Sequence, residues 1–583
     1  MKKWIKYMRP YWKFFLLGPL CIILEACGEV VMPKFMAAII DNGIATGRVS
    51  YITGIMIAMV CTALCMMAGG LGGAFFGSRA SVGFASDIRA DVFRNIQRFS
   101  FANIDKFSTG SLITRLTNDV TQLQNFVFMV LLMCMRAPSM LIGGLIMAIS
   151  INPGLARVLL VTIPLMFVFL IVIMRIGFSR FGIMQEKIDK LNNNVQENLT
   201  NVRVIKSFVR EKHQNKLFTE ANQDLRRSGI RASSVMIFMN PVMSFFMNVS
   251  TIAVIYFGGK EILTLTEAKA GMSIGDLTAF IGYISQVLGS FMMIIMMFMS
   301  SSRALASAKR IREVLEETPD ITDEMATQKD KIVENGSIEF RDVSFRYYKN
   351  SPDTVLSGIN LSINSGETVG IIGSTGCGKT TLVSLLPRLY DVDEGSVFVD
   401  GVDVRNYSLE NLRQGIGIVL QKNVLFSGSI EDNLRWGDEE ADMNALRAAA
   451  DSAQADQFVE GFTDGYETVL GQGGVNLSGG QKQRLCIARA LLKKPKILIL
   501  DDSTSAVDTA TEAKIRATFR NELKDTTKII IAQRISSVMD ADKIVVMNDG
   551  KIVGVGTHEE LLQSCEDYRE ICASQLEKKE VES

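Results

Sequence analysis

The chain has 583 residues, more than a single hydrophobic core usually organises, so we expect at least two domains. Its 62 basic and 62 acidic side chains give a formal net charge of zero, which offers no electrostatic reason to expect a nucleic-acid partner. The nine cysteines show no metal-ligand spacing, and only two histidines, His213 and His558, accompany them, which argues against a zinc site.

Hydrophobic residues are distributed unevenly along the chain. They make up 48% of the sequence, and the mean hydropathy of +0.21 is high for a soluble protein. Long apolar runs fill the chain up to about residue 302, and the remainder is typical of a soluble α/β protein. We therefore expect a membrane domain at 1–315, a linker at 316–336 and a soluble domain at 337–583.

Six stretches are long and apolar enough to cross a bilayer as helices, which takes about 20 residues each. They lie at about 14–39, 52–77, 124–150, 155–178, 235–260 and 277–300. The first follows a basic N-terminus, but it is too long for a signal peptide, so we interpret it as a retained span. The basic segment from Arg175 to Arg231 falls on the same face as the N-terminus, and the positive-inside rule predicts that both termini are cytosolic.

Two segments between the spans, about 79–123 and 180–234, are long and polar but contain helix-forming runs. A structureless loop of such length would be unusual. We therefore expect the membrane helices to continue into the cytosol and to turn near Thr109–Ile113 and Asn201–Ile205, where they could touch the soluble domain. A pair of solvated helical hairpins without a contact role is the alternative.

Charged residues occur inside two predicted spans. Glu25 and Glu29 are four residues apart in the first span and therefore share a helix face, and Arg136 lies in the third. Two interpretations are open for the carboxylates: a wall of a substrate cavity, or a structural ion pair with Arg136. The sixth span carries a methionine-rich run at 291–299, which could adapt to varied apolar shapes but is expected to serve ordinary packing.

The segment from residue 369 to 381 predicts a buried strand, a glycine-rich loop and a helix start. Gly373 to Thr380 matches the pattern G-x-x-x-x-G-K-[ST], in which backbone N–H groups wrap phosphates. Lys379 is expected to reach the β- and γ-phosphates, and the Thr380 hydroxyl to ligate Mg²⁺. The predicted ATP-binding residues of this loop are Gly373, Ser374, Thr375, Gly376, Cys377, Gly378, Lys379, Thr380 and Thr381.

A second apolar run, residues 496–502, ends in two carboxylates and is typical of a buried parallel strand. Asp501 at its end is expected to hold the Mg²⁺ shell, as a Walker B aspartate does. Asp502 would face the attacking water. The sequence therefore predicts an ATP and Mg²⁺ site shared by the glycine-rich loop and this strand.

A five-residue motif lies between these two segments and consists of Leu477, Ser478, Gly479, Gly480 and Gln481. LSGGQ after a Walker A loop and before a Walker B strand resembles the signature of ABC-transporter ATPases, and the resemblance covers the whole chain. It implies a membrane all-α domain, six transmembrane helices with long cytosolic extensions, fused to an α/β P-loop ATPase domain with a helical signature subdomain. The arrangement resembles bacterial multidrug and lipid exporters, which implies a bacterial inner membrane and a cytoplasmic ATPase domain.

The same resemblance assigns further residues. Tyr347 matches the aromatic residue that stacks on adenine, Gln421 matches the Q-loop glutamine beside the metal and the catalytic centre, and Ser505 to Asp508 match the D-loop. Segments 105–119 and 201–208 resemble coupling regions. Family members pair their ATPase domains head to tail, with the Ser-Gly-Gly turn of one capping the ATP of the other, so one motif set per chain implies a dimer.

Two positions depart from the family pattern. Asp502 stands where active members usually have glutamate, and Gln533 stands where they usually have the switch-loop histidine. Aspartate is shorter by one carbon–carbon bond, about 1.5 Å, and a misplacement near 1 Å can cost about 10²-fold in rate. Glutamine cannot carry the charge of a protonated histidine. The segment 471–474 also lacks the glutamate often found before the signature.

These departures predict a chain whose own site binds ATP but hydrolyses it poorly, while its LSGGQ completes the competent site of a non-identical partner half-transporter. Asp502, Gln533, Lys379 and Gln421 are the predicted catalytic residues. The predicted function is a subunit of an ATP-driven exporter, in contact with membrane lipid, for hydrophobic or amphipathic small molecules such as drug-like compounds or lipids. The alternatives are a slow homodimeric exporter or lipid translocase, and a regulatory membrane subunit with little turnover.

Overall fold

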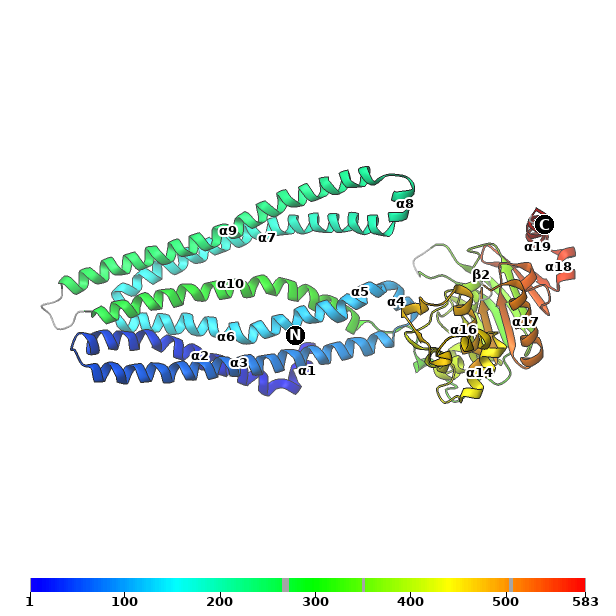
Figure 1. Cartoon of the computed structure of the whole chain (residues 1–583), viewed down its shortest axis with the longest axis horizontal. Helices are drawn as coiled ribbons and strands as arrows, with labels where there is room; N and C mark the ends of the chain where they lie inside the picture. The colour runs from blue at the N-terminus through cyan, green and yellow to red at the C-terminus, as the bar shows by residue number, and fades with distance from the viewer. Residues whose placement is uncertain (1, 265–271, 349–351, 503–506, 582–583) are drawn as a thin grey trace. The chain divides into compact units, whose positions relative to one another are not determined.

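The computed structural model describes residues 2–264, 272–348, 352–502 and 507–581. Contacts divide the chain into two compact units, which are described separately below (Figure 1). The first unit comprises residues 1–95 and 110–316, and the second comprises residues 96–109 and 317–583. The domain boundaries expected from the sequence stay a prediction.

The first unit consists of long helices. They are α2 (Trp12–Ala38), α3 (Val49–Gln97), α6 (Val120–Ile151), α7 (Pro153–Thr200), α9 (Glu211–Thr264) and α10 (Ile274–Glu316), with the short helix α1 (Lys2–Met8) at the start. Each long helix contains one of the six predicted spans almost completely. Six helices of the described residues are long and apolar enough to cross a membrane, which confirms the predicted six-helix membrane architecture.

Three of these helices are much longer than a bilayer requires. α3, α7 and α9 have 49, 48 and 54 residues, which correspond to about 70 to 80 Å at 1.5 Å per residue. A bilayer core of about 30 Å accounts for less than half of that length. The prediction that the membrane helices continue well beyond the bilayer is therefore confirmed.

The predicted turns at the far ends of these helices are half right. The chain reverses after Thr200 as expected, although the turn contains a short helix of its own, α8 (Val202–Ser207). The turn predicted at Thr109–Ile113 is wrong, because those residues form the helix α5 (Thr109–Thr114), which continues through a π-helical turn into α6. The reversal comes earlier, at the short helix α4 (Phe101–Phe107).

Local capping explains why the chain breaks on both sides of α4. Ser100 caps its start: the Ser100 hydroxyl accepts from the N–H of Asn103, and the Asn103 side chain accepts from the N–H of Ser100. Ser108 ends the helix with a positive φ of 51°. Neither signal was used for the predicted turn, which was placed from the length of the polar segment and its helix-forming runs.

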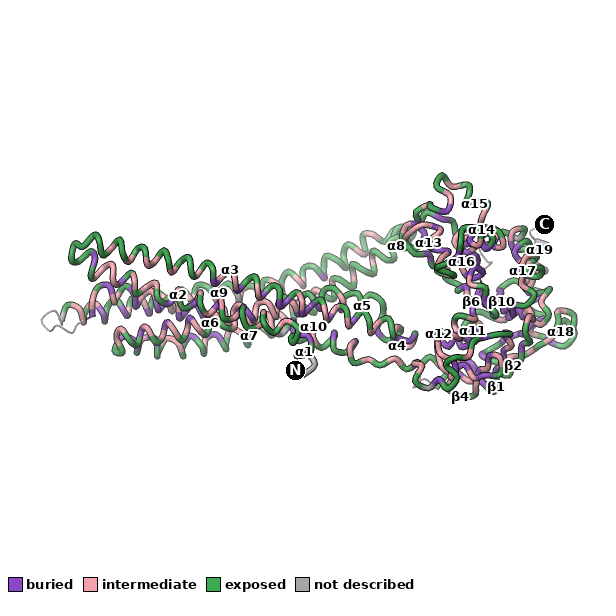
Figure 2. Tube along the Cα trace, turned by 90° about the horizontal axis from the view of Figure 1, so that it is seen from below, coloured by how far each residue is buried: buried purple, intermediate pink, exposed green. Residues whose placement is uncertain are grey.

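Small residues allow α2 and α3 to pack closely. A Cβ added at Gly69 of α3 would lie 2.8 Å from the carbonyl oxygen of Cys21 and 3.1 Å from the backbone nitrogen of Glu25, both on α2. Such small-residue contacts are typical of helix pairs in membranes. α6 packs against α10 and α2, and α7 packs against α9. Figure 2 shows these helices mainly in the colours of exposed and intermediate residues, as expected for surfaces that face lipid.

The second unit is built on a six-stranded sheet in the order β12-β11-β3-β10-β9-β6, in which the edge strand β12 alone is antiparallel to its neighbour. Its strands are β3 (Thr368–Gly373), β6 (Ile416–Val419), β9 (Ile497–Asp501), β10 (Thr527–Ile531), β11 (Lys543–Asn548) and β12 (Lys551–Gly556). β9 and β10 are buried throughout, as the continuous apolar runs in the sequence predict.

A second, antiparallel sheet has the order β2-β1-β4-β5. It consists of β1 (Ile338–Phe345), β2 (Leu356–Ile363), β4 (Glu394–Val399) and β5 (Val402–Asp403), and β7 (Gly428–Ser429) pairs separately with β8 (Val469–Leu470). The helices of the unit are α11 (Lys379–Ser384), α12 (Leu409–Gln414), α13 (Ile430–Arg435), α14 (Met443–Ser452), α15 (Asp456–Glu460), α16 (Gly479–Leu492), α17 (Thr509–Glu522), α18 (His558–Ser564) and α19 (Glu566–Val581). The predicted α/β ATPase fold class is confirmed.

Helix α4 belongs to this second unit. The Asn103 side chain donates to Glu317 at 2.9 Å, and Lys106 forms an ion pair with Glu317 at 2.8 Å. The Tyr390 hydroxyl donates to Asp105 at 3.1 Å, and the rings of Phe101 and Tyr390 lie 6.0 Å apart. The polar segment predicted to reach the soluble domain therefore does so through α4, and the alternative of a hairpin without contacts is wrong for this segment.

Candidate nucleotide site

The glycine-rich loop connects the end of β3 to the start of α11. Gly376 and Gly378 have φ values of 87° and 98°, a region that side-chain-bearing residues rarely occupy. Such a conformation lets a loop turn tightly, as a loop whose backbone N–H groups bind an anion must. The Lys379 ammonium donates to the carbonyl oxygens of Gly373 and Ser374 at 2.9 and 2.8 Å, which holds it over the loop.

Thr380 and Asp501 meet at the ends of α11 and β9. The Thr380 hydroxyl donates to Asp501 Oδ1 at 3.1 Å, and Asp501 is 2% exposed. Burial raises the pKa of the Asp501 carboxyl, while the Thr380 bond opposes that shift. Among the described residues, Asp501 Oδ2 has no hydrogen-bond partner although it is buried. A hydroxyl beside a buried carboxylate with a free oxygen fits Mg²⁺, which prefers oxygen ligands.

The two departures from the family pattern are in direct contact. Gln533 Nε2 donates to Asp502 Oδ2 at 2.9 Å. The backbone of Asp502 is also fixed, because its N–H donates to Ile531 at 3.0 Å and its carbonyl accepts from Gln483 at 3.1 Å. Gln575 donates to the carbonyl of Gln533 at 2.8 Å. Asp502 and Gln533 are therefore both held in place, and Asp502 has a φ of 49°.

Gln483 and Gln575 are supporting residues that the sequence analysis missed. Gln483 lies in α16, only 1% exposed, and Gln575 lies in α19 near the end of the chain. A glutamine two positions beyond LSGGQ and another in a charged C-terminal helix carry no motif of their own. Only the packing of α16 and α19 beside the sheet could identify them.

Tyr347 follows β1 and lies near the start of α11. Its hydroxyl and that of Thr381 are 2.9 Å apart, within hydrogen-bond distance. Its ring meets Phe345 and Tyr390 edge-on, with centroids 5.0 and 5.1 Å away. Tyr347 is 41% exposed, so part of its ring is available to stack on a base. Tyr390 supports this ring and was not singled out from the sequence.

The signature motif forms the start of α16. Ser478 is the N-cap, its hydroxyl accepts from the N–H of Gln481, and the Gln481 side chain accepts from the N–H of Ser478 at 2.9 Å. Leu477 is buried at 8% exposure. Within the described parts of the chain, no hydrogen bond joins Ser478–Gln481 to the glycine-rich loop.

Two further predicted residues lie outside the glycine-rich loop, β9 and the signature motif. Gln421 follows β6 and is exposed. Asp508 caps α17 by accepting from the N–H of Thr511 at 2.9 Å, and such backbone bonds lower the pKa of Asp508. Ser505 and Ala506 of the predicted D-loop lie outside the described residues, as do the side chains of four residues in the methionine-rich run of α10.

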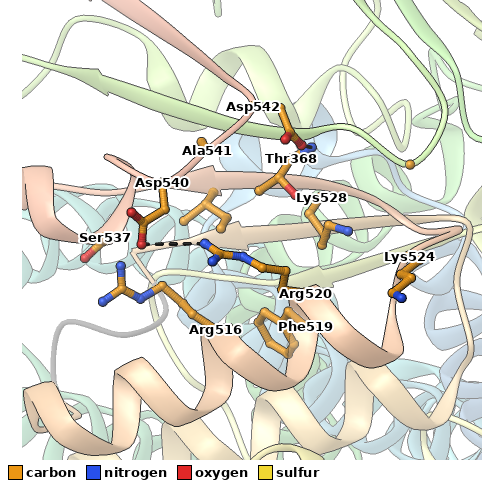
Figure 3. Close-up of a pocket in the computed structure, with 12 residues that line it drawn as sticks. Thr368, Arg516, Phe519, Arg520, Lys524, Lys528, Ser537, Asp540, Ala541 and Asp542 are labelled. Carbon is orange, nitrogen blue, oxygen red and sulfur yellow. Dashed lines mark hydrogen bonds and ion pairs between the residues drawn. The ribbon is translucent and has the colours of Figure 1, made fainter. Parts of the chain in front are cut away.

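Another hollow of the ATPase unit lies apart from these motifs (Figure 3). Its volume is about 240 Å³, and it is lined by α17, β10 and the loop before β11. Arg520 and Asp540 face each other across it at 3.6 Å. It contains none of the residues predicted to bind nucleotide, so the glycine-rich loop and β9 remain the candidate site.

A membrane unit of six long helices, joined to a P-loop ATPase unit with an LSGGQ-capped helix, is the architecture of an ABC half-transporter. The family described as "ABC transporter transmembrane region" matches residues 15–304, and the family described as "ABC transporter" matches residues 356–505. The ABC transporter ATP-binding protein YfiB of Bacillus subtilis is 38% identical over 583 residues, which is the whole of both chains. The chain therefore belongs to the ABC transporter family.

Two further similarities refine this assignment. The putative multidrug export ATP-binding/permease protein YgaD of Bacillus subtilis is 31% identical over 582 residues, 98% of each chain. A solved structure of a bacterial Atm1-family ABC exporter with ATP bound matches with a TM-score of 0.78 and 24% identity, over 97% of this chain and 98% of that one. The chain is thus a multi-pass membrane protein with the fold of an ABC exporter and an ATP-binding, ATP-hydrolysing transport domain, and such transporters work as dimers.

Proposed function

We propose that this chain is one subunit of an ATP-driven exporter and that it pairs with a non-identical half-transporter. Its own Walker site binds ATP but hydrolyses it poorly, and its LSGGQ motif completes the competent site of the partner. The cargo is a hydrophobic or amphipathic small molecule. The observation that carries the asymmetry is the contact between Asp502 and Gln533.

That contact joins the two residues expected to handle the attacking water and the γ-phosphate. A neutral amide donates to the carboxylate, so no protonated side chain is available at Gln533 to offset charge that develops on the phosphate. The Asp502 carboxylate is also about 1.5 Å shorter in reach than a glutamate would be. Two separate losses at one catalytic function favour a site specialised for binding.

Residues suited to bind ATP are present at the same site. The position of Lys379 over the loop and the exposure of Tyr347 support binding of the phosphates by Lys379 and the loop amides, and stacking of the adenine on Tyr347. Thr380 and Asp501, with Gln421 as a further candidate ligand, would hold Mg²⁺, which neutralises phosphate charge when bound. This site is therefore suited to keep ATP at a dimer interface for a long time.

The LSGGQ motif itself is intact, although the segment 471–474 before it departs from the family pattern. The reciprocal cap between Ser478 and Gln481 orders the first turn of α16, a helix of 14 residues whose N-terminus favours an anion. An intact signature has a use only if another Walker loop lies opposite it. The partner's loop, with a glutamate and a histidine at the positions of Asp502 and Gln533, would supply it.

The substrate class and the membrane rest on similarity and composition. YgaD is described as a putative multidrug export protein, which favours drug-like or lipid cargo. The positive-inside rule favours cytoplasmic termini and a cytoplasmic ATPase domain, and the bacterial relatives favour a bacterial plasma membrane.

ATP hydrolysis in lipid nanodiscs tests the asymmetry. The chain is measured alone and co-expressed with a half-transporter that carries glutamate and histidine at the positions of Asp502 and Gln533. We expect strong activity only in the mixture, a loss of at least 10²-fold when the partner's catalytic glutamate becomes glutamine, and less than threefold loss for Asp502→Asn in this chain.

Full activity from this chain alone, abolished by Asp502→Asn, would instead make Asp502 a working catalytic residue of a homodimer. A mixture that binds ATP without turnover or transport would point to a regulatory subunit.

A further inference from the structure

The hollow beside α17 in the ATPase unit is lined by more positive than negative side chains. Figure 3 shows these side chains gathered around it, with two arginines from α17 and a lysine from β10. The ionisable residues of the lining are Arg516, Arg520, Lys524, Lys528, Asp540 and Asp542. Four cationic groups and two carboxylates leave the lining with a formal charge of +2. The charge of the hollow therefore favours an anion.

The two carboxylates are weakly placed to cancel the charge of the cations. Asp540 lies 3.6 Å from Arg520, but their side chains are 62% and 67% exposed, and such exposed pairs contribute little. The Asp542 carboxylate is already used by the backbone, since it accepts from the N–H of Thr368 at 2.8 Å. Most of the positive charge of the hollow is thus available to a ligand.

Lys528 is the most buried of the four cations. It is 4% exposed, and its ammonium donates to the carbonyl oxygen of Leu523 at 2.8 Å. It forms no ion pair with any residue that the structure describes. Burial lowers the pKa of Lys528, although the nearby Asp542 opposes that shift. An ammonium that has lost most of its water and has only a carbonyl partner would be stabilised by an anion.

Arg516 provides a hydrogen-bond donor that is not used within the described parts of the chain. Its Nη1 atom donates to the carbonyl oxygen of Ser536, but its Nε atom is buried and has no hydrogen-bond partner there. Arg520 lies four residues further along α17, so both guanidinium groups belong to one face of the helix. Planar guanidinium groups match the oxygens of a phosphoryl group, which accepts several hydrogen bonds at once.

The size and the apolar part of the hollow restrict the ligand further. Its volume of about 240 Å³ is below the roughly 300–1,000 Å³ that is typical of pockets for drug-sized molecules, so the ligand must be small. Phe519 and Ile530 are buried and add apolar surface to the lining. A phosphoryl group carries a charge of about −1.5 to −2 at pH 7, which matches the excess charge of the lining better than one carboxylate would.

We propose that Arg516, Arg520 and Lys528 bind a small phosphate monoester in this hollow. The phosphoryl group neutralises the cations, and the organic substituent lies against Phe519 and Ile530. None of the residues predicted to bind ATP lines the hollow, so this site is separate from the nucleotide site. The proposal does not depend on the export function, because it concerns binding alone.

Equilibrium dialysis of phenyl phosphate and phenyl sulfate against the purified full chain tests the proposal. The two probes share a shape, and the phosphate carries up to one more negative charge. The chain is placed in phosphatidylcholine nanodiscs, empty discs are subtracted, and Mg²⁺ with a non-hydrolysable ATP analogue keeps the nucleotide site occupied. We expect saturable binding of phenyl phosphate with a Kd about tenfold or more below that of phenyl sulfate.

Two substitutions at exposed positions of the hollow should shift this affinity in opposite directions. Arg520→Gln removes one guanidinium and is expected to weaken phenyl phosphate binding by about tenfold or more. Asp540→Asn removes the competing carboxylate and is expected to strengthen it by about threefold, a gain that a folding defect cannot produce. Arg341→Gln is the matched control, because Arg341 is 59% exposed, is paired with Glu339 and lies outside the hollow. It should leave the affinity unchanged.

Three results would overturn the proposal. Equal affinity for the two probes would show that the hollow does not select a phosphoryl dianion. Unchanged affinity in a folded Arg520→Gln chain would show that the probe binds elsewhere. Displacement of phenyl phosphate by the ATP analogue would assign its binding to the glycine-rich loop.

Discussion

At the scale of single residues, the predicted ATP-binding residues and the predicted catalytic residues make different contacts. Lys379, Thr380 and Asp501 are in contact with the loop or with each other, and a buried oxygen of Asp501 is left for a metal. Asp502 and Gln533 instead contact each other. The difference between these two groups is the physical basis for the proposal that this site binds ATP but hydrolyses it poorly.

Restoring the family residues should restore hydrolysis at this site. The double variant Asp502→Glu with Gln533→His regains both the longer carboxylate and a side chain that can carry a proton. We expect at least a tenfold rise in the ATPase rate of the chain in a mixture whose partner has lost its own catalytic glutamate. Either single change should give less than the pair, because the two residues act on one step. An unchanged rate in the double variant would show that the defect lies elsewhere.

The folding stability of the ATPase unit depends in part on the buried side chain of Arg388. Arg388 is 1% exposed and is held by Asp391 through two hydrogen bonds of 2.8 and 3.0 Å. Removing the partner of a buried charge leaves that charge uncompensated.

We expect Asp391→Ala to lower the free energy of unfolding by roughly 3 kcal/mol, the low end of the range for such pairs, because Asp391 is 32% exposed. Thermal unfolding of the purified chain measures this. The matched control is Asp464→Ala, which removes another aspartate of the same unit, and a comparable loss there would contradict the special role of Asp391.

At the scale of elements, α4 is connected through aromatic rings to Tyr347, the residue predicted to stack on adenine. Phe101 of α4 lies beside Tyr390, and Tyr390 lies edge-on to Tyr347. The Tyr390 hydroxyl donates to Asp105, and burial raises its pKa, so the phenol stays protonated and able to donate at physiological pH. A change at the nucleotide therefore has a short, packed route to α4.

Tyr390→Phe keeps the ring and removes the bond to Asp105, which is worth about 1.5–3 kcal/mol as a hydrogen bond to a charged group. We expect ATP affinity to change less than twofold, because Tyr347 keeps its aromatic support, while the amount of cargo transported per ATP falls severalfold. Transport and ATPase assays on the same proteoliposomes give the ratio of cargo transported to ATP hydrolysed. Tyr348→Phe, at a residue that is 72% exposed, is the control. A proportional loss of both activities would argue against a coupling role.

At the scale of the whole molecule, the proposed function has one chain supply halves of two different sites. Its glycine-rich loop and β9 would form one half of its own site, and the capped start of α16 would form one half of the partner's. In the proposed pair the two halves contribute unequally to ATP turnover. A substitution that disables one half should therefore lower the ATPase rate more than a substitution that disables the other.

Two variants of this chain separate the contributions. Ser478→Arg places a bulky cation at the start of α16, where a phosphate should dock, and is expected to lower ATPase activity of the mixture at least 10²-fold. Lys379→Ala weakens the chain's own site and is expected to lower activity less than tenfold. Thermal unfolding of each variant controls for the loss of the Ser478 cap, which is worth about 1 kcal/mol. Equal losses would contradict the asymmetric pair.

The sequence by itself determined the elements whose signals are local. Six long apolar runs predicted the membrane helices, because the bilayer fixes their length, and the glycine-rich loop, β9 and the LSGGQ cap were predicted from patterns of a few consecutive residues. The signals at Ser100 and Ser108 are also local, but the turn was predicted from the length of the polar segment and its helix-forming runs, which is why it was misplaced.

Only the tertiary structure decided which distant residues meet. Gln533 reaches Asp502 because β9 and β10 are neighbours in the sheet, and Arg136 reaches both glutamates because α6 packs against α2. The order of strands and the choice of helix partners depend on how whole faces of elements bury one another. Hydrophobic patterns show that a face is buried, but they do not show what buries it, so these contacts could not be read along the chain.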